Sequence, residues 1–182
     1  PNQTTAVKIL LDNLKKCRVI NDPAEIIGIG HRIVAGGETF KTSTLINKDN
    51  LQQIYDLKEY APLHDEAEAD VIKAFLELLP NVPEVAVFDT AFHQSLDPVH
   101  YLYSLPYKYY EKYKARKYGA HGTSVRFVIR EASKLLNKPL DQLKLIVCHL
   151  GSGASITAVK DGKSLDTSMG FTPLAGITMS TR

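Results

Sequence analysis

The chain has 182 residues, with 22 Lys and Arg against 20 Asp and Glu, so its net charge is +2. Its length suits one ordinary domain, or a domain and a fragment, and 44% hydrophobic with 23% charged residues excludes a disordered chain. The small net charge argues against a general nucleic-acid binder. No apolar run approaches the roughly 18–20 residues that a membrane-spanning helix needs.

The termini and the cysteines suggest a cytoplasmic piece of a longer chain. The start at Pro1 lacks the basic and then apolar pattern of a signal peptide. The missing initial Met and the abrupt end at Arg182 favour a piece cut from a longer chain, with omitted flexible ends as the alternative. Cys17 and Cys148 lie in apolar segments, so we expect two buried free thiols rather than one disulfide.

Hydrophobic periodicity predicts alternating helices and strands. In chain order we expect a helix over residues 4–16, a strand over 25–34, helices over 50–59 and 64–79, a strand over 84–89, helices over 109–118 and 123–136, a strand over 144–150, and a hairpin of 155–159 with 163–167. Thr123 or Ser124 is expected to cap the last helix, and Asp161-Gly162 to form the hairpin turn. This alternation predicts an α/β layered fold without internal repeats.

A Gly-rich loop at residues 149–155 is the first chemical signal. Gly151 and Gly153 let the backbone turn tightly and expose N–H groups to an anion. A Rossmann or Walker A loop would open a helix, whereas a hairpin follows here. The order strand, loop, hairpin is typical of the phosphate loop of actin and the sugar kinases, and a plain β-turn is the alternative.

Four polar motifs stand at element ends, where ligands bind in α/β sheets: residues 30–32, 62–64, 88–93 and 119–124. Arg32 suits bidentate binding of a carboxylate or phosphate. Asp89 ends its strand as a Mg²⁺ ligand often does. His121 lies at a helix start, a position that favours anions.

Each of these residues also has a structural interpretation. Arg32 could form an ion pair with Asp89, and four histidines are more often packing or hydrogen-bonding residues than catalysts: His31, His64, His93 and His100. The histidine spacing makes a zinc site unlikely, and no serine-nucleophile motif is present. The basic, Tyr-rich residues 107–117 suit a solvated helix face or a partner surface.

Together these motifs closely resemble the acetate kinase family. The matching stretches run in family order: residues 28–34, 61–64, 87–94, 118–124, 148–155 and 168–176. The resemblance implies an incomplete actin-like phosphotransferase fold of the acetate and sugar kinase, ribonuclease H-like type. Residues 1–142 would belong to the acetate-side domain and residues 143–182 would begin the nucleotide-binding domain. The implied reaction is reversible transfer of the ATP γ-phosphoryl group to acetate, with Mg²⁺, giving acetyl phosphate and ADP in a cytoplasmic homodimer.

The resemblance also assigns roles to residues. Arg32 would hold the acetate carboxylate, and the acyl pocket would be lined by Val34, Leu63 and Pro173. Asp89 would act through Mg²⁺ or as the acidic catalytic residue, His121 would stabilise the equatorial oxygens, and Arg182 would clamp the transferring group. The ATP phosphates would lie against five consecutive residues: His149, Leu150, Gly151, Ser152 and Gly153.

Departures from the family pattern leave alternatives open. The family usually has Asn at Ser152, an aromatic residue at Ala120, Glu at Ala175 and Gly at Ser180. A propionate or butyrate kinase, or a non-catalytic binding domain derived from the family, is therefore an alternative. The family's N-terminal phosphate loop and its adenosine-binding part are not found, so we expect these 182 residues alone to be inactive.

Overall fold

The computed structural model describes residues 2–59 and 65–180. The chain divides into two compact units: unit 1 is Pro1–Ala35 with Ser43–Val87, and unit 2 is Gly36–Thr42 with Phe88–Arg182. The predicted domain division between residues 142 and 143 concerns the whole protein and stays a prediction.

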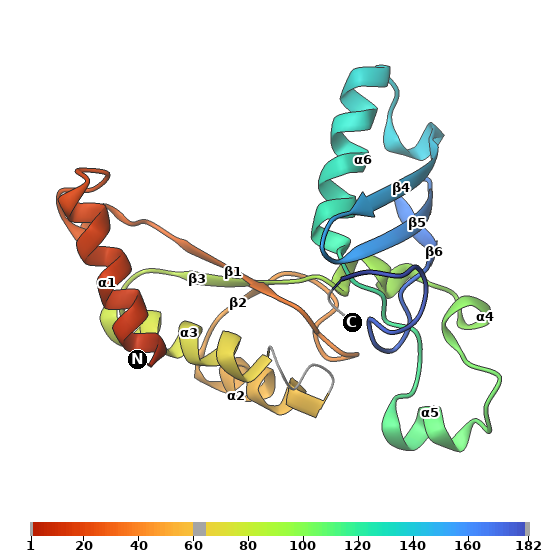
Figure 1. The fold of residues 1–182 in the computed structure, drawn as a ribbon, viewed down its shortest axis with the longest axis horizontal. Coiled ribbons are helices and arrows are strands. Elements are labelled where there is room, and N and C mark those ends of the chain that lie inside the picture. The colour runs from red at the N-terminus through yellow and green to blue at the C-terminus, as the bar shows by residue number, and fades with distance from the viewer. Residues whose placement is uncertain (1, 60–64, 181–182) are drawn as a thin grey trace. The chain divides into compact units, whose positions relative to one another are not determined.

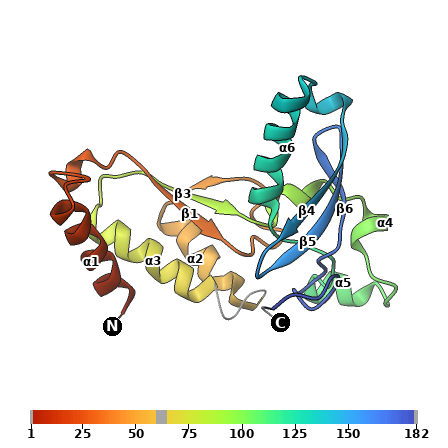
Figure 2. The ribbon, with the colours of Figure 1, turned by 45° about the horizontal axis from the view of Figure 1, so that its top comes forward.

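Unit 1 is built on the three-stranded sheet β1-β3-β2. Its strands are β1 (Ile29–Ile33), β2 (Thr44–Leu45) and β3 (Glu84–Phe88), and β2 runs antiparallel to β3. Figures 1 and 2 show α2 (Lys48–Asp56) and α3 (Asp65–Leu78) on the same side of this sheet. Helix α3 also packs against α1 (Gln3–Lys16), through a core cluster that contains Val7, Leu11, Ala74 and Leu79.

Unit 2 is built on the antiparallel sheet β4-β5-β6. Its strands are β4 (Lys144–Leu150), β5 (Ala154–Lys160) and β6 (Lys163–Thr167). Helix α6 (Gly122–Leu136) packs against β4, and the short helix η3 (Ala91–Ser95) contacts both β6 and α6. Their shared core cluster is Phe92, Val125, Ile129, Val147 and Val159.

The predicted hairpin is confirmed in detail. Lys160 pairs with Lys163 across a two-residue turn. Asp161 and Gly162 both have positive φ, 53° and 74°. Two consecutive positive φ angles are what a type I′ turn requires, and Asp-Gly is a preferred sequence for it.

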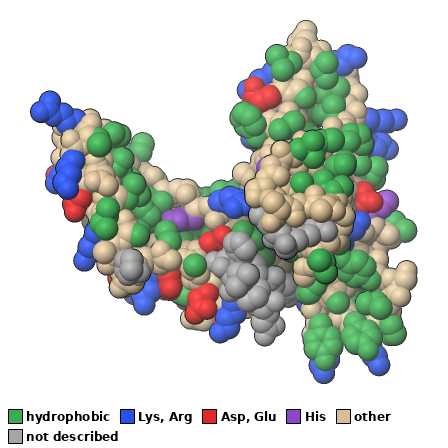
Figure 3. All heavy atoms as spheres, in the orientation of Figure 1, with side chains coloured by type: hydrophobic (Ala, Val, Ile, Leu, Met, Phe, Trp, Pro, Cys, Tyr) green, Lys and Arg blue, Asp and Glu red, His purple; other side chains and the backbone are tan. Residues whose placement is uncertain are grey.

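The β4 strand has one buried and one exposed face. Val147 is 4% exposed, whereas Ile146 and Leu150 are 67% and 74% exposed. Figure 3 shows hydrophobic side chains at the surface over this sheet. Cys148 lies on the exposed face and Cys17 is exposed as well. The prediction of free thiols is therefore confirmed, while the prediction that they are buried is wrong.

Several predicted boundaries move. The strand expected from residue 25 begins at Ile29, because Pro23–Glu25 forms a 3₁₀ helix (η1) capped by Asp22. The helix expected over residues 109–118 is α5 (Lys108–Tyr113), which ends where Lys114 takes a φ of 51°. Among the described residues, five short elements were not predicted: β2, η1, η3, α4 (Pro98–Tyr101) and η4 (Leu140–Gln142). The short helix η2 (Leu57–Glu59) falls within the helix predicted over residues 50–59.

The basic segment after α5 is only partly solvated. Arg116 is 5% exposed, stacks 3.6 Å above the Tyr101 ring and donates to Glu38 Oε1 at 3.0 Å. A buried guanidinium with these partners holds its segment in place. For Arg116, the expectation of a solvated helix face is wrong.

Candidate active site

Asp89 lies directly after β3 and is 1% exposed. Its backbone carbonyl accepts a hydrogen bond from the Gly122 N–H at 2.9 Å. The next residue, Thr90, accepts a bond from the Gly36 N–H at 3.0 Å through its hydroxyl. These bonds fix the end of β3 beside the first turn of α6, where the predicted catalytic residue His121 lies.

His121 is the N-cap residue of α6 and has a φ of 60°. A left-handed conformation is uncommon for a residue other than glycine, and it persists where the surrounding contacts impose it. The ring is half-buried, and its Nδ1 lies 2.9 Å from the hydroxyl of Ser155, a fully buried residue of β5. The expectation that Thr123 or Ser124 caps α6 is wrong.

His149 on β4 stacks on His121. The two ring centroids are 4.0 Å apart and the planes differ by 20°. His149 Nδ1 lies 2.9 Å from the Ser124 hydroxyl, so the predicted cap residue holds a histidine instead of a backbone N–H. The structure thus brings together His121 and His149, which the sequence had assigned to the transferring group and to the nucleotide.

The loop 150–153 turns without special backbone conformations. Neither Gly151 nor Gly153 is among the glycines with positive φ. The Gly151 N–H donates to the Gly153 carbonyl at 3.1 Å, so in this structure that group is engaged within the loop, and anion binding by the loop stays a prediction. A Cβ on Gly151 would meet its nearest neighbour, Gly153 O, at 3.4 Å, an ordinary contact. The protein's own packing therefore does not require glycine at position 151.

The same loop is tied to the end of the described chain. The hydroxyls of Ser152 and Ser180 lie 2.9 Å apart, and the Ser180 N–H donates to the Ser152 carbonyl at 3.2 Å. Leu150, Gly151 and Ser152 are exposed. A ligand could reach these three residues without displacing core side chains.

Arg32 lies in unit 1 on the exposed face of β1. Gly30, two residues earlier on that face, would carry a Cβ into open space. His31 points to the other face, where its Nε2 lies 2.6 Å from Oε2 of the buried Glu84. His31 is therefore a core residue paired with a carboxyl group. On the opposite face, no described side chain covers the backbone at Gly30, which lies beside Arg32.

A cavity of about 450 Å³ lies against β1 and α3 in unit 1. Arg32 is among its lining residues, and most of its wall is apolar, with Ile33, Val71 and Phe75. Val34 is not in that lining; its N–H donates to Glu68 Oε2 at 3.0 Å. Val34 therefore does not line this cavity together with Arg32, and the prediction that both residues contact acetate stays a prediction.

The other predicted residues fall elsewhere. Pro173 is exposed in the segment that follows β6. Leu63, His64 and Arg182 lie outside the described residues. The alternative ion pair between Arg32 and Asp89 stays a hypothesis.

Two serines contact the histidines; Ser124 was predicted only as a possible helix cap, and Ser155 was not predicted as a site residue. Ser124 and Ser155 supply hydroxyls within 2.9 Å of His149 and His121, respectively. Ser155 carried a usable signal, because it is a polar residue at a strand position between two apolar ones, Ala154 and Ile156.

His93 was expected to be a packing or hydrogen-bonding residue, and the structure shows it buried with two polar contacts. Its Nε2 lies 2.9 Å from the Ala120 carbonyl, and its Nδ1 lies 2.9 Å from the Ser164 hydroxyl. Burial, the largest influence, lowers the pKa of His93 to about 4 against the opposing effects of Ala120 and Asp89. The ring is therefore neutral at pH 7.

No helix within residues 2–59 and 65–180 combines the length and apolar character needed to cross a membrane. In the same ranges, no three His, Cys, Asp or Glu side chains gather into a protein-only metal cluster.

Comparison with known proteins identifies close relatives. A family model described as the acetokinase family matches residues 1–182. The acetate kinase of Lactiplantibacillus plantarum is 64% identical over 177 residues, and that of Bacillus subtilis is 58% identical over 182. These alignments cover 97% and 100% of this chain but 45% and 46% of the relatives, so the chain spans under half of their length.

Solved structures of acetate and propionate kinases have the same fold as this chain. The acetate kinase of Porphyromonas gingivalis superimposes with a TM-score of 0.93 at 41% identity. A propionate kinase from Francisella tularensis superimposes with a TM-score of 0.90 at 45% identity. Each match covers 98% of this chain and 45% of the solved one. The predicted α/β, actin-like phosphotransferase fold is confirmed.

Proposed function

Because this chain belongs to the acetokinase family, we propose that the full-length protein is an acetate kinase. It would transfer the γ-phosphoryl group of ATP to acetate, reversibly, giving acetyl phosphate and ADP. The observation that carries this proposal is the stacked pair His121 and His149. His121 precedes Gly122, whose N–H is bonded to the Asp89 carbonyl, and His149 begins the Gly-rich loop.

The reaction sets the requirements for the site. A carboxylate oxygen attacks the γ-phosphorus while the bond to the β–γ bridging oxygen breaks, and ADP leaves. The nucleophile is already an anion, so no general base is needed. The difficulty is bringing anions together and stabilising charge on the transferring group, which calls for fixed cationic and hydrogen-bonding groups.

The proposed roles follow those requirements. Arg32 binds the acetate carboxylate, because a guanidinium offers two parallel N–H donors. Val34, Leu63 and Pro173 contact the methyl group. His121 donates to an equatorial oxygen of the transferring phosphoryl group, and Arg182 neutralises its charge. The His121 ring is held from one side by Ser155 and from its face by His149, which supports a fixed donor.

The nucleotide phosphates lie against residues 149–153 in this proposal. Exposure of Leu150, Gly151 and Ser152 supports it, as does the room left at Gly151. A glycine that packing does not require is explained if a ligand approaches the backbone there.

Asp89 is the residue proposed to hold Mg²⁺. Magnesium is usually bound through one or two carboxylates together with substrate phosphates and water, so a single buried carboxylate fits it. When bound, Mg²⁺ supplies positive charge that offsets the negative charge of the phosphates.

A propionate or butyrate kinase is the second candidate. Ala120 is half-buried where an aromatic residue is expected from the family pattern, and a smaller side chain leaves more room for an acyl chain. One of the similar solved structures is that of a propionate kinase. The homodimer and the cytoplasmic location remain expectations from the family resemblance.

Assays of the full-length protein would test both candidates. Purified protein is incubated with ATP, Mg²⁺ and acetate, propionate or butyrate, and the acyl phosphate is trapped as its hydroxamate. The highest kcat/KM with acetate supports the proposal, and the highest value with propionate or butyrate supports the second candidate. Absence of any acyl phosphate would overturn both and favour the non-catalytic alternative.

A further inference from the structure

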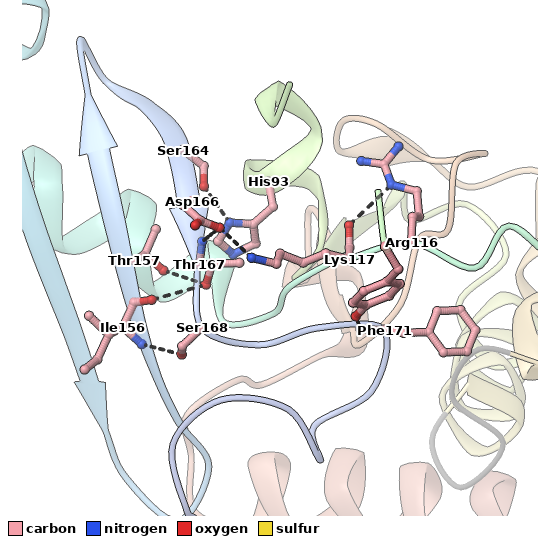
Figure 4. A network of polar contacts seen from close by, with 11 residues as sticks. His93, Arg116, Lys117, Ile156, Thr157, Ser164, Asp166, Thr167, Ser168 and Phe171 are labelled. Carbon is pink, nitrogen blue, oxygen red and sulfur yellow. Dashed lines mark hydrogen bonds and ion pairs between the residues drawn. The ribbon is translucent and has the colours of Figure 1, made fainter. Parts of the chain in front are cut away.

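His93 lies four residues after Asp89 in the short helix η3 and is 1% exposed. Figure 4 shows its ring directed toward Ser164 of β6, and its other nitrogen contacts the Ala120 carbonyl. Both ring nitrogens are therefore engaged at 2.9 Å. No role in the reaction has been assigned to it above.

The partners of His93 determine which nitrogen carries its proton. A carbonyl oxygen only accepts hydrogen bonds, so Nε2 must carry the hydrogen that reaches Ala120. Since the ring is neutral, Nδ1 has no hydrogen and accepts one from the Ser164 hydroxyl. The position thus selects one tautomer, the Nε2–H form.

The backbone that His93 contacts is the segment before His121. Gly119 has a φ of 72°, and a Cβ there would lie 2.8 Å from Cδ2 of His93. Ala120 follows, held by its carbonyl, and then His121 with a φ of 60°. One residue with a left-handed conformation lies on each side of Ala120. The Ala120 carbonyl is therefore the point at which this loop is held in place.

We propose that His93 is a positioning residue for His121: its Nε2–H group anchors the Ala120 carbonyl and so aims the His121 ring. This inference rests on the proposed function, in which His121 contacts the transferring phosphoryl group. A ring that merely filled the core would need neither hydrogen bond, and any side chain of similar volume would replace it.

Two substitutions separate these roles in the full-length protein. In His93→Gln the side-chain amide nitrogen reaches the place of Nε2 and can still donate to Ala120. In His93→Asn the shorter amide reaches only the place of Nδ1, so the contact with Ser164 is kept and the contact with Ala120 is lost. Both variants replace the ring with a neutral amide, and they differ by one methylene.

The expected result is a difference in kcat. A loosened catalytic group loses on the order of 10²-fold in rate, so His93→Asn should lower kcat by about that factor while the KM values for acetate and ATP stay within about threefold. His93→Gln should remain within roughly tenfold of the unmodified protein. Equal kcat values for the two variants, at equal thermal stability, would overturn the proposal.

A second measurement is independent of activity and of variant folding. Nitrogen-15 NMR of histidine-labelled full-length protein reports the tautomer of each ring. His93 should be in the Nε2–H form at pH 7, and Ser164→Ala should shift its Nδ1 signal. A protonated or Nδ1–H ring would overturn the proposal even if the variants fail to fold. If the NMR result holds but no acyl phosphate forms in any assay, the proposed function fails and the anchoring of the Ala120 carbonyl stands.

Discussion

The two glycine-containing loops of unit 2, residues 119–122 and residues 150–153, are held in opposite ways. In the first, a Cβ on Gly122 would lie 2.3 Å from the Asp89 carbonyl, and Gly119 has a φ of 72° with its space filled by His93 and Thr167. In the second, no such clash exists at Gly151. In the first loop the protein's own packing requires the glycines, whereas in the second it does not require glycine at position 151. We infer that the first aims a group and that the second receives a ligand.

The largest effect should come from the group that the first loop aims. His121→Ala in the full-length protein should lower kcat by on the order of 10²–10³-fold, with little change in KM for ATP, because it removes a donor to the transferring group. Steady-state kinetics would measure this. Ser124→Ala, which removes the hydroxyl that contacts His149 and leaves His121 in place, is the matched control and should lose less. A kcat loss below about fivefold for His121→Ala would remove this histidine from the reaction.

The neutral state of His93 predicts a pH dependence for the first loop. Its pKa is about 4 when folded, against about 6.5 in an unfolded chain. The unfolded state therefore binds more protons between these values, so stability falls as pH falls from about 6.5 to about 4. The loss of unfolding free energy is at most about 3–4 kcal/mol, because each pKa unit corresponds to about 1.4 kcal/mol.

Urea unfolding at several pH values would test this dependence. His93→Gln has no titrating ring at this position and should show a smaller loss over the same range. If the unfolding free energy of the unmodified protein and that of His93→Gln fall equally with pH, His93 titrates normally in the folded state.

Gly122→Ala should destabilise the protein by about 1–3 kcal/mol, because the new methyl group meets a backbone carbonyl that cannot move aside. The midpoint of urea unfolding measures the change. Gly28→Ala is the control, since its Cβ would meet nothing closer than the Pro83 carbonyl at 3.9 Å. If both variants unfold at the same midpoint, the first loop is not fixed in the way described.

The smallest effect is expected in the second loop. Gly151→Ala should leave the unfolding midpoint within about 0.5 kcal/mol of the unmodified protein, because its methyl group finds ordinary contacts. If phosphates approach the backbone there, the KM for ATP should rise about tenfold, with a smaller change in kcat. An unchanged KM would show that this loop does not receive the nucleotide.

The same two loops mark how far the sequence predicts the site. The motif around Gly151 was recognisable because β4, the loop and the hairpin are consecutive, and local patterns specify each of them. The hydrogen bonds that hold the loop 119–122 in place were not predictable, because they join His93, Ala120 and Ser164, which are far apart in the sequence. A serine such as Ser124 can hydrogen-bond either to the backbone at a helix end or to a distant side chain. Local preference predicted the helix cap, whereas the structure shows the bond to His149.

Element boundaries failed for related reasons. The helix predicted over residues 109–118 stops at Tyr113, and the following Arg116 is buried against Tyr101 and Glu38. Tertiary contacts there override a helical pattern of charged residues and tyrosines. The strand β2 is only two residues long, Thr44–Leu45, and its pairing with β3 is not encoded in a local pattern.

The β5–β6 hairpin has a consequence for the order of folding. Ser155 lies on β5 and Ser164 on β6, so one local element supplies the hydroxyl partners of both His121 and His93. A hairpin with a favourable Asp-Gly turn forms within microseconds, faster than contacts between distant segments. We expect both serines to be in register before η3 and α6 dock, so each histidine arrives at a partner that is already in place.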